Sequence, residues 1–148
     1  MNDDLEDAAF LALIDDDAHS AQLLTRTLLD QGASGVHCYG DAGLAITRLR
    51  ALMADPAATL PQLIIVDLKE HSGANLEFLE TARQLLRNFG VSVVVLAAQK
   101  DEARRQALLA NGAASVWVRH ADRDAYRRVA ADIVQFATHQ QRLEAVGM

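Results

Sequence analysis

At 148 residues, the chain has the length of one well-packed domain. Its hydrophobic share of 51% and charged share of 23% are ordinary for a globular protein, and no apolar run is long enough to span a membrane. The net charge of −6 argues against nonspecific binding to nucleic acid. The acidic start is unlike a secretory signal, and a single cysteine excludes an intrachain disulfide, so we expect a cytoplasmic protein.

The first part of the chain alternates between strand and helix patterns. The apolar run FLALI from Phe10 predicts a buried strand, and the helical pattern that follows it stops near Gly32. GVHCY from Gly35 mixes polar and apolar residues, which is typical of a strand at a sheet edge, and we interpret its Cys38 as a small packing residue. Asp41 is placed to cap the next helix.

The same alternation continues after a loop, ADPAATLPQ. LIIV from Leu63 and VSVVVL from Val91 predict two more buried strands, and a helical pattern lies between them. Asp101 precedes a short helix that ends near Gly112, SVWV from Ser115 predicts a fourth buried strand, and the longest helical pattern closes the chain. Five strand and helix pairs predict a doubly wound α/β fold with a parallel sheet.

Carboxylates follow two of the predicted strands. Asp15 and Asp16 come directly after the first strand, and Asp67 comes after the third. Ligands of doubly wound folds gather at the carboxyl ends of the strands, so these side chains converge if the two strands are neighbours. Such a group of oxygens suits Mg²⁺, and the cation would offset the repulsion between the carboxylates. Asp17 directly precedes a helix, and we interpret it as the helix N-cap.

Three blocks of the sequence resemble the receiver domain of response regulators. They are LALIDDDAHSAQLL, LPQLIIVDLKEHSGANLEFL and VVVLAAQKDEARRQALLANGAASVWVRH, and the resemblance covers about residues 9–137. It implies a flavodoxin-like fold, with a five-stranded parallel sheet in the order 2-1-3-4-5 and five helices. It also divides the chain into an acidic tail (1–8), a receiver domain (9–138) and an extension of the last helix (139–148).

The resemblance implies a role for each acidic residue. Asp67 resembles the phosphoacceptor, which receives a phosphoryl group from a histidine kinase or a phosphotransfer protein. Asp16 resembles a direct Mg²⁺ ligand and Asp15 its outer-shell companion, and the backbone carbonyl of Lys69 would be a further ligand. A carboxylate is a competent nucleophile for this transfer, and the metal neutralises charge on the phosphate.

Two site residues depart from the family pattern. Ala97 stands where a Ser or Thr hydroxyl usually binds the phosphoryl group, so that hydrogen bond is missing. Arg119 replaces the usual lysine at the end of the fifth strand, which keeps the charge but adds a planar fork. It could hold a phosphate, or it could clamp unphosphorylated Asp67 in a bidentate pair and imitate an occupied site.

Other departures surround the site. His120 replaces the proline that normally follows a cis peptide, and we expect a trans bond there because a non-proline cis bond costs about 3 kcal/mol. Asn75 stands where a glycine is usual, and Asn tolerates the left-handed conformation. Val116 takes the place of the usual aromatic switch residue, and we interpret the neighbouring Trp117 as core packing. His71 and His120 invite a transition-metal interpretation, but no spacing resembles a zinc site.

The resemblance implies a non-enzymatic, single-domain receiver whose output is contact with another protein. A basic stretch from Lys100 to Arg128 falls on the fourth helix, fifth strand and fifth helix, which similar receivers use for downstream partners and homodimers. Ala97 and Arg119 leave open a pseudo-receiver adaptor that acts without phosphorylation. Two less favoured alternatives are a flavodoxin-like cofactor binder and a Mg²⁺-dependent phosphohydrolase that uses Asp15 and Asp17 as a D-x-D pair.

Overall fold

The structure is a computed structural model that describes residues 9–146, with side chains described to residue 140. Its strands are β1 (Leu11–Ile14), β2 (Val36–Gly40), β3 (Leu63–Val66), β4 (Val93–Ala97) and β5 (Ala113–Val118). Its helices are α2 (Ala18–Asp30), α3 (Ala42–Ala54), α4 (Ala74–Phe89), α5 (Glu102–Ala110) and α6 (Arg123–Val146). All five predicted strands are present, so the predicted alternation is confirmed.

The strands form one parallel sheet in the order β2-β1-β3-β4-β5. This order confirms the expected topology and places β2 at an edge. β1 and β3 are neighbours, and their last residues, Ile14 and Val66, are paired in register. The residues that follow these two strands, Asp15 and Asp67, therefore leave the sheet side by side.

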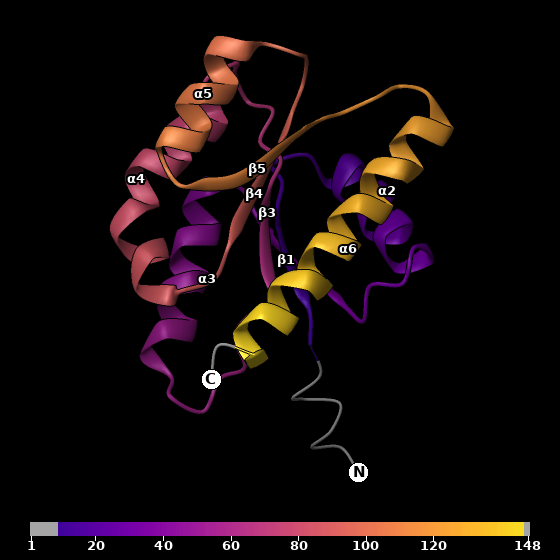
Figure 1. Cartoon of the computed structure of the whole chain (residues 1–148). Coiled ribbons are helices and arrows are strands. Elements are labelled where there is room, and N and C mark those ends of the chain that lie inside the picture. Colours follow the sequence, from indigo (N-terminus) through magenta and orange to yellow (C-terminus); the bar gives the residue numbers. More distant parts are fainter. Residues whose placement is uncertain (1–8, 147–148) are drawn as a thin grey trace.

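Helices cover both faces of the sheet. α2 and α6 lie on one face, whereas α3, α4 and α5 lie on the other (Figure 1). Alternate strand residues supply the two cores: Leu13 and Ile65 pack under α2 and α6, and Ile64 packs with Phe78 of α4. Burial on both faces explains why these strands read as continuous apolar runs.

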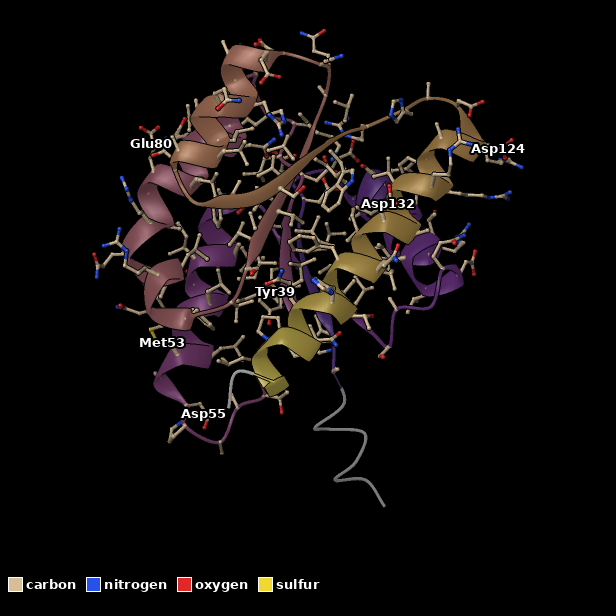
Figure 2. The ribbon with its side chains drawn as sticks, viewed as in Figure 1. Tyr39, Met53, Asp55, Glu80, Asp124 and Asp132 are labelled. Carbon is tan, nitrogen blue, oxygen red and sulfur yellow. The ribbon has the colours of Figure 1, made fainter. Side chains whose placement is uncertain are left out.

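Charged side chains lie on the outer faces of α4 and α6. Glu80 on α4 and Asp132 on α6 are exposed on opposite sides of the molecule (Figure 2). None of the helices in the described part of the chain is long and apolar enough to cross a membrane.

Three aspartates cap helices, and two of them, Asp17 and Asp41, were predicted to do so. Asp17 accepts hydrogen bonds from the backbone N–H groups of His19 and Ser20 at the start of α2. Asp41 and Asp101 cap α3 and α5 in the same way. These side chains satisfy backbone donors that the first helical turn leaves without partners.

Some expectations were wrong or fall outside the described residues. Cys38 is exposed and its sulfur lies 3.3 Å from the Thr25 hydroxyl, so it is not a buried packing residue. The prediction that SVWV is a buried strand was also wrong, because Ala113 is the one buried residue of β5. β2 likewise has one buried residue, and both are edge strands, which are covered less completely than central ones. The acidic tail at 1–8 lies outside the described residues.

Candidate functional site

Two buried carboxylates meet at the carboxyl edge of the sheet. The side chains belong to Asp15, which is 5% exposed, and Asp67, which is 1% exposed. Backbone hydrogen bonds hold both: the N–H of Asp15 donates to Gly40 and that of Asp67 donates to Ile14. The structure thus brings together the two strand ends that the sequence predicted to converge.

The Lys69 side chain lies between these carboxylates. Its Nζ is 2.8 Å from Asp15 Oδ1 and 3.0 Å from Asp67 Oδ2, and it also donates a hydrogen bond to the Asp67 backbone carbonyl. One ammonium group therefore contacts both acids. Its attraction to them opposes the repulsion that two neighbouring carboxylates would otherwise exert.

Arg119 supplies a second cation from the end of β5. Its Nε lies 2.9 Å from Asp67 Oδ1, and its backbone N–H donates to the Ala97 carbonyl at the end of β4. The contact runs through Nε, and the bidentate clamp that the sequence suggested is not formed. With Lys69, Arg119 balances the two buried carboxylates charge for charge.

Burial dominates the electrostatics of the site. It raises the pKa of the Asp67 carboxyl, although Lys69 and Arg119 act in the opposite direction. Tyr126 on α6 also feels the site: burial and the nearby Asp67 and Asp15 raise the pKa of its hydroxyl to about 12. A buried carboxylate at this position depends on its cations, because without them desolvation would favour the protonated form.

Asp16 lies apart from this cluster of four charged groups. Its Oδ1 accepts a hydrogen bond of 2.9 Å from the Lys69 N–H, and its Oδ2 accepts one of the same length from the Glu70 N–H. Asp16 therefore fastens the loop after β3 to the loop after β1. It does not share a position with Asp15 and Asp67 in which all three carboxylates contact one ion.

One buried oxygen of this site could contact a cation such as Mg²⁺, but the site as a whole does not suit the metal. Asp15 Oδ2 is buried without a hydrogen-bond partner, which is a feature that a cation could satisfy. However, no group of three His, Cys, Asp or Glu side chains in the described part of the chain is placed to hold a metal ion. The Lys69 ammonium also takes the position between the carboxylates. As arranged here, the residues do not fit the metal.

Sequence reasoning missed the roles of two side chains. Lys69 was considered only for its backbone carbonyl, although a lysine two residues after Asp67 was a visible signal. Asn75 was considered for left-handed backbone, but it lies in α4, and no described residue other than glycine has a positive φ. Its side chain instead accepts from the Leu68 N–H and donates to the Leu96 carbonyl, which joins the ends of β3 and β4.

The remaining departures have simple surroundings. The peptide bond before His120 is trans, as predicted, because the described chain contains no cis peptide. The Trp117 ring packs edge-on against Phe136 with centroids 5.8 Å apart, which confirms its packing role. His71 forms a 3.1 Å contact with Glu77 on the other side of the loop.

The D-x-D interpretation fails on the position of its second carboxylate. Asp17 points at the start of α2, where both its hydrogen bonds go to backbone N–H groups, whereas Asp15 points into the cluster. A phosphohydrolase of that kind needs both carboxylates at one centre. The geometry therefore gives no support to that alternative.

The chain matches no protein-family model and no curated protein. Solved structures do match it. The phosphorylated cyanobacterial phytochrome response regulator RcpA matches with a TM-score of 0.71 at 19% identity, over 88% of this chain and 94% of that chain.

Two further structures agree. A CheY-like receiver domain from Methanospirillum hungatei JF-1 gives a TM-score of 0.68 at 18% identity, over 90% of this chain and 97% of its own. The Mn²⁺-bound response regulator Rcp1 gives 0.66 at 19% identity, over 84% and 91%. This chain therefore has the fold of the response-regulator receiver domains.

Proposed function

We propose that the chain is a signalling module of the receiver type that works through contact with a partner protein and keeps its acidic site closed with its own cations. The observation that carries this proposal is the Lys69 ammonium, which contacts Asp15 and Asp67 together. The Lys69 ammonium is part of the chain. The folded protein therefore offsets the charge of these carboxylates without binding a cation from solution.

The surroundings of Asp67 support this proposal, because its carboxylate is buried and already paired with cations. The side chain is 1% exposed, and both of its oxygens contact cations, which lowers the readiness of either oxygen to attack a phosphoryl donor. Ala97 at the end of β4 has no hydroxyl that could bind a phosphoryl group on Asp67. A module built in this way can act as an adaptor whose surface is ready for its partner without phosphorylation.

The basic stretch supports an acidic partner. Its exposed arginines and lysine lie on α5, on the loop before it and on α6, at the side of the molecule closed by the edge strand β5. They are Lys100, Arg104, Arg105, Arg123, Arg127 and Arg128. Because the chain as a whole carries −6, this concentration of positive charge favours a protein partner with a negative face, and the same surface could pair two copies of the chain.

A second candidate function is phosphoryl acceptance on Asp67 from a histidine kinase or phosphotransfer protein. The orphaned Asp15 Oδ2 beside Asp67 favours it, because that atom lacks a partner in the closed site. In this candidate Asp67 is the acceptor and Arg119 holds the phosphoryl charge. Asp15, Asp16, Asp67 and the Lys69 carbonyl would be the Mg²⁺ ligands. Lys69 Nζ and the Asp16 side chain would both have to leave their present partners.

Acetyl phosphate distinguishes the two candidates. The protein is incubated with this donor and Mg²⁺, and intact mass spectrometry reports whether a phosphoryl group has been added, with Asp67→Asn as the control. We expect no Asp67-dependent addition to the wild-type protein. Stoichiometric addition that disappears in Asp67→Asn would establish the second candidate and overturn the first.

A further inference from the structure

A cavity of about 730 Å³ opens beside the acidic cluster, on the face of the sheet that α4 and α5 cover. This volume falls in the range of small-molecule sites, which is roughly 300–1,000 Å³. Its apolar walls come from the ends of three strands and from both helices. They are Leu68, Leu76, Ala97, Leu108, Val116 and Val118.

The small side chains of two strands leave this space open. Ala97 at the end of β4 contributes one methyl group, and Val116 of β5 contributes a short branched side chain. Leu108, which is buried on the inner side of α5, lines the same space. A ligand with an apolar body gains by replacing water against such walls.

The wall on the α5 side is held in place by one arginine. Arg104 donates a hydrogen bond from Nη1 to the Ser72 carbonyl in the loop before α4, and its Nε lies 3.3 Å from Asp101. These contacts tie α5 to that loop across the rim of the cavity. The contact between α5 and the loop before α4 therefore helps to keep this wall of the cavity in position.

Four of the five cations in the lining are paired with carboxylates. Lys69 and Arg119 contact Asp15 and Asp67, Arg104 contacts Asp101, and Arg105 contacts Glu102. Lys100 has no ion pair among the residues that the structure describes. Its ammonium charge at the rim of an apolar cavity favours one anionic group.

We propose that this cavity binds a small organic anion that has an apolar body and one carboxylate, sulfonate or phosphate group. The apolar body would lie against Leu108 and Val116, and the anionic group would face the Lys100 ammonium at the rim. This role does not depend on whether Asp67 accepts a phosphoryl group. It would make the module responsive to a small molecule in addition to its protein partner.

Two fluorescent probes test the proposal. Anilinonaphthalene sulfonate has an apolar aromatic body and one negative charge, and N-phenylnaphthylamine has the same body without the sulfonate. We expect saturable binding of the first, with amide NMR shifts centred on Leu108 and Val116, and binding of the second that is about threefold weaker, the size of one exposed charge interaction. Equal affinities, or NMR shifts centred on α6, would overturn the proposal.

Variants locate the binding. Val116→Phe narrows the cavity and should weaken binding of the sulfonate probe, and Val116→Leu provides a milder change if the first variant does not fold. The matched control is Val134→Phe, which adds the same volume on the opposite face of the sheet, where Val134 packs on the other core. Unchanged binding in a folded Val116 variant would contradict the assignment.

The charge requirement has its own control. Lys100→Gln removes a cation from the rim and should weaken the sulfonate probe by about threefold while leaving the neutral probe unaffected. Arg83→Gln removes an exposed cation of α4 that does not line the cavity, and it should change neither affinity. If both variants weaken binding of the sulfonate probe equally, the effect comes from the overall charge of the protein, and the proposed contact at the rim of the cavity is wrong.

Discussion

At the scale of single residues, the site is defined by which cation each buried carboxylate contacts. Lys69 Nζ bridges Asp15 and Asp67, and Arg119 Nε holds the other oxygen of Asp67. Removing one partner from such a group leaves the others buried without compensation, which costs more than the intact pair contributes.

Lys69→Met should therefore destabilise the protein. Methionine keeps the length of the side chain but leaves Asp15 and Asp67 facing each other, so we expect a loss of about 1–3 kcal/mol in the free energy of unfolding. Urea denaturation measures this loss. Lys100→Met, at an exposed position without a described ion pair, is the matched control, and equal losses in both variants would argue against the bridge.

Tyr126 reports the negative charge of the same site. Its pKa is raised to about 12 from the ordinary 10.0, so between these two values the unfolded chain ionises while the folded chain stays protonated. Its contribution to stability is complete below pH 10.0 and disappears as the pH rises toward 12.

Phenolate absorbance tests this origin of the pKa shift. The difference between the wild-type and Tyr126→Phe titrations isolates Tyr126 from Tyr39, whose pKa burial also raises. Asp67→Asn removes one negative neighbour and should lower the pKa of Tyr126. An unchanged titration curve would show that burial alone causes the shift.

At the scale of elements, the Asn75 side chain connects the start of α4 to the carboxyl ends of β3 and β4. It lies in the first turn of α4, where Gly73 offers no side-chain cap, and its amide group bonds to the strand ends at Leu68 and Leu96. These two bonds align β3 with β4, and so they help to place Asp67 beside Ala97.

Asn75→Ala should cost about 1–3 kcal/mol of unfolding free energy, because it leaves buried backbone groups without partners. The matched control is Asn88→Ala, at an exposed position of the same helix, which reports the change in helix propensity alone. Chemical denaturation measures both. Equal midpoints for the two variants would mean that the Asn75 bonds contribute nothing.

The elements themselves were predictable, because each has a local signal. Continuous apolar runs marked the central strands, and Asp17, Asp41 and Asp101 marked helix starts. The burial of Cys38 was predicted wrongly, since the sequence of an edge strand does not say which of its side chains a neighbouring helix covers. Strand order came from the resemblance, because periodicity does not determine which strands are neighbours.

The site was predictable only in its acids. Asp15 and Asp67 follow strands, and strand ends have fixed positions, so their convergence follows from topology. Lys69 and Asn75 act through long side chains that reach across loops, and their partners depend on torsion angles that no local pattern specifies. The same reason explains why Asp16 was expected beside a metal but bonds to loop N–H groups.

At the scale of the whole molecule, charge is divided between two neighbouring regions. The acidic cluster at the end of β1 and β3 is neutralised internally, whereas exposed arginines and a lysine gather on α5, on α6 and on the loop before α5, three of them paired with neighbouring carboxylates. We propose that, in this receiver fold, Lys69 takes the place of an external cation.

Isothermal titration of Mg²⁺ into the wild-type protein, Lys69→Met and the double variant Lys69→Met with Asp67→Asn tests that claim most directly. Removing the ammonium should make Mg²⁺ binding to Lys69→Met at least about tenfold tighter than to the wild type, a difference of about 1.4 kcal/mol, and the double variant should lose the gain. If the wild-type protein binds Mg²⁺ as tightly as Lys69→Met does, Lys69 does not take the place of the metal and the account is contradicted.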